Sequence, residues 1–264
     1  MSAVAPAPVR SPLTSALSGT TAVLVGGTSG IGLAAGALLR SVGARVVLVG
    51  RDPERLKVAV ARLREGGPAD GLDDAVQGVT GDAADEGALA RAFDAAGTVD
   101  HVLVTAGGMN GIGPVTGLST DEIRTTVDAR LQAAFGAARV AADRLSAGGS
   151  LTFTSGTLVV RPVPGTAALV SAVGAVETFT RALAVELAPA RLRVNAVRFG
   201  RVDTPLMRSL PGLDSDEAVA AAGSGAPLGR IATAEEAAAA ALFFMANGYV
   251  TGQVVTVDGG ESLV

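Results

Sequence analysis

Few side chains in this chain can carry out acid–base or nucleophilic chemistry. The sequence has one Tyr, one His and one Lys, at Tyr249, His101 and Lys57, and it has no Cys. The absence of Cys excludes thiolate nucleophiles, disulfides and cysteine-bound metals. A Tyr and a Lys share a helix face when they lie four residues apart, and no such pair exists here. The side chains alone therefore give little sign of acid–base catalysis.

A glycine-rich turn follows the first apolar run and opens a helix rich in Ala and Leu. It reads Gly-Gly-Thr-Ser-Gly-Ile-Gly from Gly26 to Gly32. Such a turn brings backbone N–H groups and the positive end of a helix to a pyrophosphate. Glycines also form ordinary turns, which is the alternative interpretation. The residues predicted to hold a dinucleotide here are Gly26, Thr28, Ser29, Gly30, Ile31 and Gly32.

The end of the second apolar run predicts which dinucleotide binds. In a dinucleotide-binding unit, a carboxylate at this point favours a free ribose 2′-hydroxyl, and an Arg favours a 2′-phosphate. Arg51 follows the run directly, so NADP(H) is the predicted cofactor. Asp52 is adjacent and acidic, but it precedes Pro53 and is expected to cap the helix that begins there.

Short runs rich in Val and Leu alternate with segments of helical length along the chain. The predicted strands are 21–26, 45–50, 101–106, 151–154, 193–199 and 254–257. The predicted helices are 31–41, 53–64, 86–95, 120–145, 167–187 and 233–246. This alternation is typical of a parallel sheet covered on both faces. We expect a single-domain, doubly wound α/β fold over residues 19–264, with its ligand at the carboxyl ends of the strands.

Two segments fall outside this alternation. Residues 1–18, with Pro6, Pro8 and Pro12, show neither a signal-peptide core nor an Arg-rich amphipathic face, and we expect a flexible tail. Residues 204–227 are rich in Pro and Gly and would overhang the ligand edge. A mobile substrate lid is expected there, and a plain surface loop is the alternative.

Composition narrows the class of partner. A net charge of −4, spread without blocks, offers no surface for nucleic acid. The apolar stretch 237–246 is about half of the ~20 residues that a membrane-spanning helix needs. We therefore expect a cytoplasmic protein that acts on a small molecule and contacts neither nucleic acid nor membrane.

Several motifs together resemble the short-chain dehydrogenase/reductase family, from about residue 17 to the end. The glycine-rich turn resembles the turn of that family, with Val25 in place of its Thr. The segments 181–189, 193–197 and 257–260 are very close to its consensus. The resemblance implies a Rossmann-like fold, a nicotinamide cofactor and a homodimer or homotetramer. It adds six positions to the predicted cofactor site, which are Asp82, Ala83, Ala106, Gly107, Val202 and Thr204.

The resemblance fails at the catalytic positions. The family uses a Ser, a Tyr and a Lys four residues after the Tyr, supported by an Asn on the preceding long helix. Counting back from the segment 174–177 places the Tyr position at Leu169 and the Lys position at Val173. The Asn position holds Arg130, and Ser155 alone remains of the four. No Tyr or Lys lies between Lys57 and Tyr249, so no shift of the alignment restores the pair.

Ser155 and Arg130 are the predicted catalytic residues, and each has a structural alternative. Ser155 would hydrogen-bond a carbonyl, an amide or the cofactor carboxamide, or else its own backbone in a turn. Thr157 is a second, weaker candidate. Arg130 would bind an anionic or carbonyl group, or else form an ion pair with an acid such as those at 128, 143 and 177. His101 is expected at the far end of its strand, and Tyr249 is expected to pack between a helix and a strand.

The missing acid favours particular substrates. Reduction of a ketone creates an alkoxide that must be protonated, whereas hydride addition to an iminium yields a neutral amine. Some reductases and cyclases of indole-alkaloid pathways form a divergent subgroup of the family that lacks the Tyr and Lys. This chain resembles that subgroup in having Arg130 and Arg161. Gly165 and Thr166 stand where some of those relatives have an acid. We expect an NADP(H)-dependent reductase of an activated C=N or C=O group; a cyclase, an isomerase or a catalytically silent binding protein is the alternative.

Overall fold

The computed structural model describes residues 13–67 and 73–264. Seven parallel strands form one sheet in the order β3-β2-β1-β4-β5-β6-β7. The strands are β1 (Thr21–Val25), β2 (Arg45–Gly50), β3 (Val76–Thr80), β4 (Val99–Val104), β5 (Leu145–Gly156), β6 (Arg193–Phe199) and β7 (Val254–Val257). The order reverses between β1 and β4, and ligands of doubly wound folds bind at the carboxyl ends of strands at such a point. The predicted fold class is confirmed.

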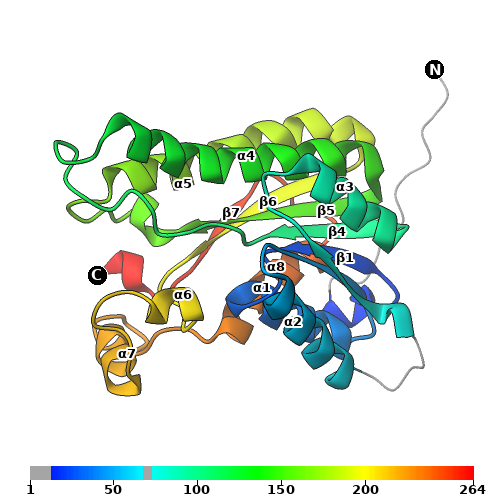
Figure 1. Cartoon of the computed structure of the whole chain (residues 1–264), viewed down its shortest axis with the longest axis horizontal. Coiled ribbons are helices and arrows are strands. Elements are labelled where there is room, and N and C mark those ends of the chain that lie inside the picture. The colour runs from blue at the N-terminus through cyan, green and yellow to red at the C-terminus, as the bar shows by residue number, and fades with distance from the viewer. Residues whose placement is uncertain (1–12, 68–72) are drawn as a thin grey trace.

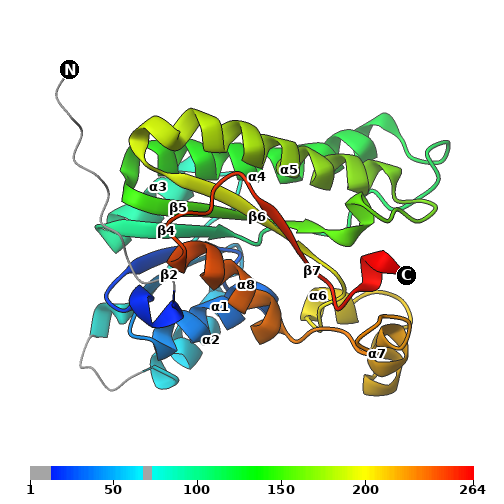
Figure 2. The ribbon, with the colours of Figure 1, turned by 180° about the vertical axis from the view of Figure 1, so that it is seen from behind.

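Helices cover both faces of the sheet, as Figures 1 and 2 show. One layer contains α3 (Glu86–Ala96), α4 (Thr120–Arg144) and α5 (Ala167–Leu187). The other contains α1 (Gly30–Ser41), α2 (Pro53–Glu65) and α8 (Ala234–Ala246). Each layer buries its own apolar cluster against the sheet, so the strands are enclosed on both sides. The sheet thereby becomes a rigid platform for the loops at its carboxyl edge.

Side-chain caps explain where several helices begin. Asp52 accepts hydrogen bonds from the N–H groups of Glu54 and Arg55 at the start of α2. Thr233 and Glu236 form a capping box at the start of α8, as the sequence predicted. Ser119 and Glu122 form a second capping box at the start of α4. These caps fix the directions in which α4 and α8 leave the loops around the site.

Several predicted boundaries were wrong. Strand β3 was not predicted, because it is a short edge strand whose side chains are mostly half-buried or exposed. Strand β4 ends at Val104, so Thr105 and Ala106 lie in the loop after it. Strand β5 spans Leu145–Gly156 and is longer at both ends than the predicted strand 151–154. The predicted flexible tail 1–18 extends too far, because Leu17 is already buried in the core. Residues 1–12 of that tail lie outside the described part of the chain.

The predicted lid contains two short helices, α6 (Pro205–Arg208) and α7 (Asp216–Gly223). Arg208 joins them to the body, with bonds of 2.6 and 2.8 Å to the Asp203 carboxylate and a contact of 2.9 Å to Asp216. The bidentate Arg208–Asp203 pair is half-buried, whereas Asp216 is 87% exposed and its contact weakens with added salt. The Val219 side chain on α7 is buried, so the segment is anchored by this ion pair and by apolar packing.

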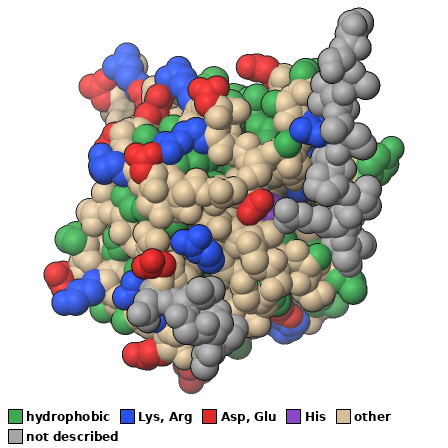
Figure 3. All heavy atoms as spheres, turned by 90° about the vertical axis from the view of Figure 1, so that its right-hand side faces the viewer, with side chains coloured by type: hydrophobic (Ala, Val, Ile, Leu, Met, Phe, Trp, Pro, Cys, Tyr) green, Lys and Arg blue, Asp and Glu red, His purple; other side chains and the backbone are tan. Residues whose placement is uncertain are grey.

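Two surface properties bear on the expected partners. Figure 3 shows Lys and Arg interspersed with Asp and Glu on the face it displays. The segment Ala167–Ala190, which contains α5, is long and apolar enough to cross a membrane, with a mean hydropathy of 1.4. The sequence prediction had considered only the shorter stretch 237–246. Half of the most apolar part of this segment is buried in the molecule. A helix in a protein core can have the same length and hydropathy as a membrane-spanning helix.

Candidate active site

The glycine-rich turn packs directly against the loop that follows β4. A Cβ atom at Gly26, whose φ is +90°, would lie 2.7 Å from Oγ1 of Thr105. A Cβ atom at Gly32 would lie 2.4 Å from the carbonyl oxygen of Gly26. Thr105 also donates hydrogen bonds to the carbonyls of Val25 and Gly26. The turn therefore requires glycine at both positions, and its shape leaves its backbone open to a ligand.

The start of α1 offers unused hydrogen-bond donors. Its N-cap residue, Ser29, makes no side-chain cap bond among the described residues. The N–H of Leu33 donates to the Ser29 carbonyl, and the N–H groups of the first turn precede it. These donors and the positive end of the helix suit a pyrophosphate. The residues present thus fit the phosphate portion of a dinucleotide.

The turn also reaches the end of β2, where the adenosine would bind. A Cβ atom at Gly50 would lie 2.4 Å from Cγ2 of Thr28, so Thr28 lies over the end of that strand. The Arg51 guanidinium is 82% exposed and lies 3.9 Å from the carboxylate of Asp82 after β3. Asp52 faces α2 instead. The hydrogen bond from the Arg55 N–H is the largest influence that lowers the pKa of Asp52. The predicted capping role of Asp52 is confirmed, and the Arg51 side chain remains exposed at the end of β2.

The segment before the lid approaches the same turn from the other side. A Cβ atom at Gly30 would lie 3.2 Å from Cγ2 of Thr204. Val202 forms an isolated parallel bridge with Ala232, which holds this segment in place. The Thr204 hydroxyl accepts a hydrogen bond from the Met207 N–H and caps α6. Val202 and Thr204 thus lie next to the predicted pyrophosphate site.

Arg130 lies across the loop that follows β4. Its Nη2 donates a 2.8 Å hydrogen bond to the carbonyl of Gly108. A Cβ atom at Gly107 would lie 2.6 Å from Cζ of Arg130. Burial lowers the pKa of the guanidinium. Within 13–67 and 73–264, Arg130 has no carboxylate partner, so the alternative of a structural ion pair is not observed.

Ser155 occupies the end of β5 and faces α5. Its hydroxyl donates a 2.6 Å hydrogen bond to Oε1 of Glu177. Glu177 in turn binds Arg198 on β6 at 2.9 and 2.6 Å, and Arg198 donates to the hydroxyl of Thr256 on β7. The burial of Glu177 opposes its ionisation, but the bonds from Arg198 and Ser155 outweigh it and lower the pKa of the carboxyl. The Ser155 proton is thus directed at a carboxylate and not at the cleft.

The positions assigned to the Tyr and the Lys are apolar and enclosed. Leu169 and Val173 are 3% and 6% exposed on the sheet-facing side of α5. The sole Tyr does not replace them, because Tyr249 is 98% exposed. The prediction that Tyr249 packs between a helix and a strand was wrong: its N–H donates to the Asn247 side chain in a turn that carries the ring outward. The sole Lys, Lys57, is exposed on α2.

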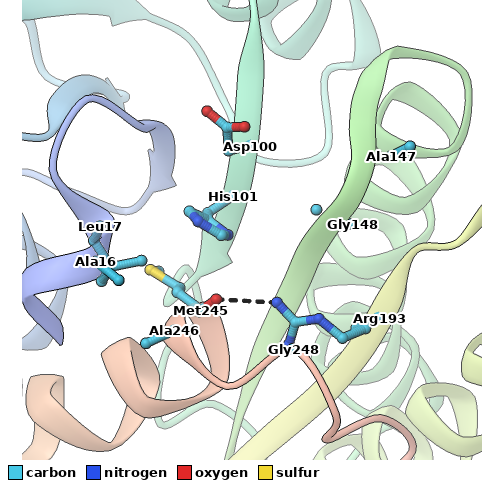
Figure 4. Close-up of a pocket in the computed structure, with 11 residues that line it drawn as sticks. Ala16, Leu17, Asp100, His101, Ala147, Gly148, Arg193, Met245, Ala246 and Gly248 are labelled. Atoms are coloured by element: carbon cyan, nitrogen blue, oxygen red, sulfur yellow. Dashed lines mark hydrogen bonds between the residues drawn. The ribbon is translucent and has the colours of Figure 1, made fainter. Parts of the chain in front are cut away.

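The sole His lies away from the cofactor edge, as predicted. His101 lines a cavity of about 40 Å³ near the amino-terminal ends of β4, β5 and β6. Figure 4 shows its side chain among the lining residues. His101 is buried and hydrogen-bonded to Ser150 at 2.9 Å. Arg193 lines the same cavity and donates to the carbonyl of Met245 at 3.0 Å, at the end of α8. Burial lowers the pKa of Arg193 to about 10. These contacts hold α8 to the sheet.

The structure brings most of the predicted residues to one edge. The glycine-rich turn, the residues after β2 and β4, and the segment at Val202 and Thr204 adjoin one another. Arg161 is exposed in the loop after β5 and shows no contact with them among the described residues. Sequence reasoning missed the Glu177–Arg198 pair. The available signal was the position of Glu177, which lies four positions after Val173 and eight after Leu169. A charged residue at this spacing falls on the apolar face of α5.

Comparison with known proteins agrees with this geometry. The family model described as enoyl-(acyl carrier protein) reductase matches residues 25–262. The short-chain dehydrogenase/reductase malC of Malbranchea aurantiaca is 32% identical over 94% of this chain and 96% of its own. The short-chain reductase protein NovJ of Streptomyces niveus is 34% identical over 92% of this chain and 94% of its own.

Solved structures show the same likeness. The structure of MalC reductase/Diels-Alderase from Malbranchea aurantiaca superimposes with a TM-score of 0.85 at 30% identity, covering 96% of this chain and all of the other. A short-chain type dehydrogenase/reductase from Mycobacterium ulcerans gives a TM-score of 0.84 at 33% identity, covering 93% of this chain and 90% of the other. By sequence and by fold, this chain belongs to the short-chain dehydrogenase/reductase family.

Proposed function

We propose that this protein is an NADP(H)-dependent oxidoreductase that reduces an iminium or a similarly activated C=N or C=O group of a small molecule. One observation carries the proposal. The carboxyl edge of the sheet has a turn that fits a dinucleotide, while Leu169 and Val173, both buried, take the positions of the proton donor and its cation. When bound, the nicotinamide supplies a hydride. Addition of that hydride to an iminium needs no proton, whereas addition to a ketone leaves an alkoxide that does.

The preference for NADP(H) rests on the end of β2. Arg51 is exposed there, and a guanidinium binds phosphate through paired charge-assisted hydrogen bonds. Asp52 does not compete for the ribose, because its carboxylate caps α2. Arg51 forms an ion pair with Asp82, and their contact of 3.9 Å is loose enough for a phosphate to displace.

Ser155 and Arg130 would orient the substrate. Because the Ser155 hydrogen is directed at Glu177, its oxygen offers lone pairs and accepts hydrogen bonds. An iminium N–H is a donor that matches such an acceptor. Arg130 offers the complementary group, a partly desolvated cation that binds a carbonyl or carboxylate of the substrate. The pair therefore suits a substrate with both a C=N⁺ group and a nearby carbonyl.

A non-redox cyclase or isomerase is the second candidate. The solved relative MalC, at 30% identity, is described as both a reductase and a Diels-Alderase. A cycloaddition needs a shaped cleft and oriented partners, and it needs no proton donor. A cyclase of this kind would form its product without consuming NADPH.

We further propose a homodimer or homotetramer formed through the long helices and the last strand. Phe135 on α4 and Val185 on α5 are 43% and 77% exposed, and Val255 on the edge strand β7 is 39% exposed. Large apolar side chains on an outer helix layer and an unpaired strand edge favour association with a second copy.

The proposal is tested with matched substrates. Purified protein is mixed with NADPH and either a cyclic iminium or the ketone of the same ring skeleton, and NADPH fluorescence and product mass are followed. We expect reduction of the iminium at a rate at least about a hundredfold above that of the ketone, the range that a missing general acid accounts for. Equal rates would contradict the proposal. Product formed without loss of NADPH would favour the cyclase.

A further inference from the structure

Arg130 has more hydrogen-bond donors than partners. A guanidinium carries five N–H groups, and the single hydrogen bond given to Arg130 in the described part of the chain goes to the Gly108 carbonyl. The side chain is desolvated enough that burial lowers its pKa. The side chain is half-buried, so its remaining donors still reach the solvent side of the loop. These donors are available to oxygen atoms of a ligand bound there.

Among the described residues, no side chain accepts a hydrogen bond from these donors. The Glu177 carboxylate is occupied by Arg198 and Ser155, and the Ser155 hydroxyl is occupied by Glu177. Leu169 and Val173 carry no polar atoms. The guanidinium also lies closely against Gly107, where a Cβ atom would come within 2.6 Å of Cζ. The backbone at Gly107 and the cation above it thus form one polar surface.

The topology decides which ligand atoms reach this surface. Gly107 follows β4, and the sheet order reverses between β4 and β1. Gly26 packs against Thr105 and Ala106, and Gly107 directly follows them, so Gly107 lies beside the pyrophosphate turn. A dinucleotide with its adenosine at Arg51 lies over β2 and β3 on one side of that turn. Its second nucleoside must therefore extend to the β4 side, with its ribose nearest the turn.

We propose that Arg130 binds the ribose hydroxyls on the nicotinamide side of NADP(H), in addition to any contact with substrate. The inference rests on the proposed cofactor. A ribose offers two adjacent hydroxyl oxygens, and the planar fork of a guanidinium can donate to both. Arg130 is thereby a cofactor-positioning residue, which holds the second nucleoside against Gly107.

Fragments of the cofactor test this role without any turnover. Binding of NADPH, of ADP-ribose 2′-phosphate and of 2′,5′-ADP is measured by calorimetry. ADP-ribose 2′-phosphate keeps the second ribose but lacks the nicotinamide, and 2′,5′-ADP lacks both. We expect Arg130→Leu to raise the Kd for NADPH and for ADP-ribose 2′-phosphate by about tenfold. The Kd for 2′,5′-ADP should stay unchanged. Arg124→Leu, an exposed position on the same helix, is the matched control and should change none of the three.

The outcomes separate the inference from the proposal on which it rests. Unchanged binding of ADP-ribose 2′-phosphate to Arg130→Leu would overturn the ribose contact, as would equal weakening of all three ligands. Failure of the unaltered protein to bind NADPH and 2′,5′-ADP would overturn the proposed cofactor itself. Arg130→Lys provides a second variant if Arg130→Leu does not fold. This variant keeps the charge but loses the planar fork of the guanidinium. Its affinity for NADPH and for ADP-ribose 2′-phosphate should fall between those of the unaltered protein and Arg130→Leu.

Discussion

The hydroxyl of Ser155 donates a 2.6 Å hydrogen bond to the Glu177 carboxylate, although Ser155 ends the strand that leads to the cleft. Glu177 also binds Arg198, so Ser155, Arg198 and Thr256 form one polar row across β5, β6 and β7. This row fixes α5 to the sheet at the level of the active site. It also makes Ser155 a hydrogen-bond acceptor toward any substrate.

Breaking this row is expected to destabilise the protein strongly. In Glu177→Gln, Arg198 keeps its charge but loses its carboxylate partner, while its side chain is only 13% exposed. The free energy of unfolding should fall by about 3 kcal/mol, which urea titration measures. Asp121→Asn removes an exposed pair with Arg124 and should cost less than about 1 kcal/mol. Similar losses in the two variants would contradict the structural role of the buried pair.

The same pair predicts a pH dependence of stability. The pKa of Glu177 is lower in the folded protein than its ordinary value of 4.5. Because this pKa is lowered, the ionised carboxylate contributes its full stabilisation at pH values above 4.5. The contribution is lost as the pH falls through the pKa of the folded state. The difference in unfolding free energy between the unaltered protein and Glu177→Gln should therefore shrink below pH 4.5. A difference that stays constant with pH would count against an ionised Glu177.

Gly32→Ala should weaken cofactor binding. The added Cβ would lie 2.4 Å from the Gly26 carbonyl oxygen, so the turn must move. We expect the Kd for NADPH to rise more than about tenfold. Gly174→Ala is the matched control, because its Cβ would meet only Val159 at 3.7 Å. Fluorescence titration of both variants checks this, and unimpaired binding by Gly32→Ala would place the pyrophosphate elsewhere.

Arg51→Ala should change cofactor preference. Loss of charge-assisted hydrogen bonds to a 2′-phosphate is expected to raise the Kd for NADPH by about tenfold or more. The Kd for NADH, which lacks that phosphate, should stay unchanged. Arg55→Ala, another exposed Arg at the start of α2, serves as the control. Equal affinity of the unaltered protein for NADPH and NADH would show that Arg51 does not select the phosphate.

Restoring the family pair should add a reaction. Leu169→Tyr with Val173→Lys places a phenol and an ammonium four residues apart on the sheet-facing side of α5. Ketone reduction is expected to rise by about a hundredfold over the unaltered protein. Leu169→Phe with Val173→Met fills similar volume without a titratable group and should give no gain. Circular dichroism and thermal melting establish that each variant is folded before the rates are compared.

The sequence predicted the parts of the molecule that local rules govern. The glycine-rich turn was recognisable because close packing at Gly26 and Gly32 leaves no room for side chains. The capping role of Asp52 followed from Pro53, whose fixed φ suits a first helical turn. The parallel sheet followed from apolar runs that alternate with helical segments.

The parts that escaped prediction depend on contacts between distant segments. Ser155 meets Glu177 across 22 positions of the chain, and Arg198 meets Glu177 across 21. No local pattern shows which acid a buried Arg will find, and candidate acids for Arg130 were named without the carbonyl of Gly108 that it binds. Strand β3 was missed because an edge strand lacks the continuous apolar run of a buried one.

The central claim is that this site transfers a hydride without an acid of its own. The most direct measurement uses NADPH deuterated at the transferable C4 position and a cyclic iminium, with mass spectrometry of the amine product. The account predicts one deuterium in the amine, one NADP⁺ formed for each amine, and reduction of the matched ketone at least about a hundredfold slower. Tight binding of the labelled NADPH without deuterium in any amine product would contradict it.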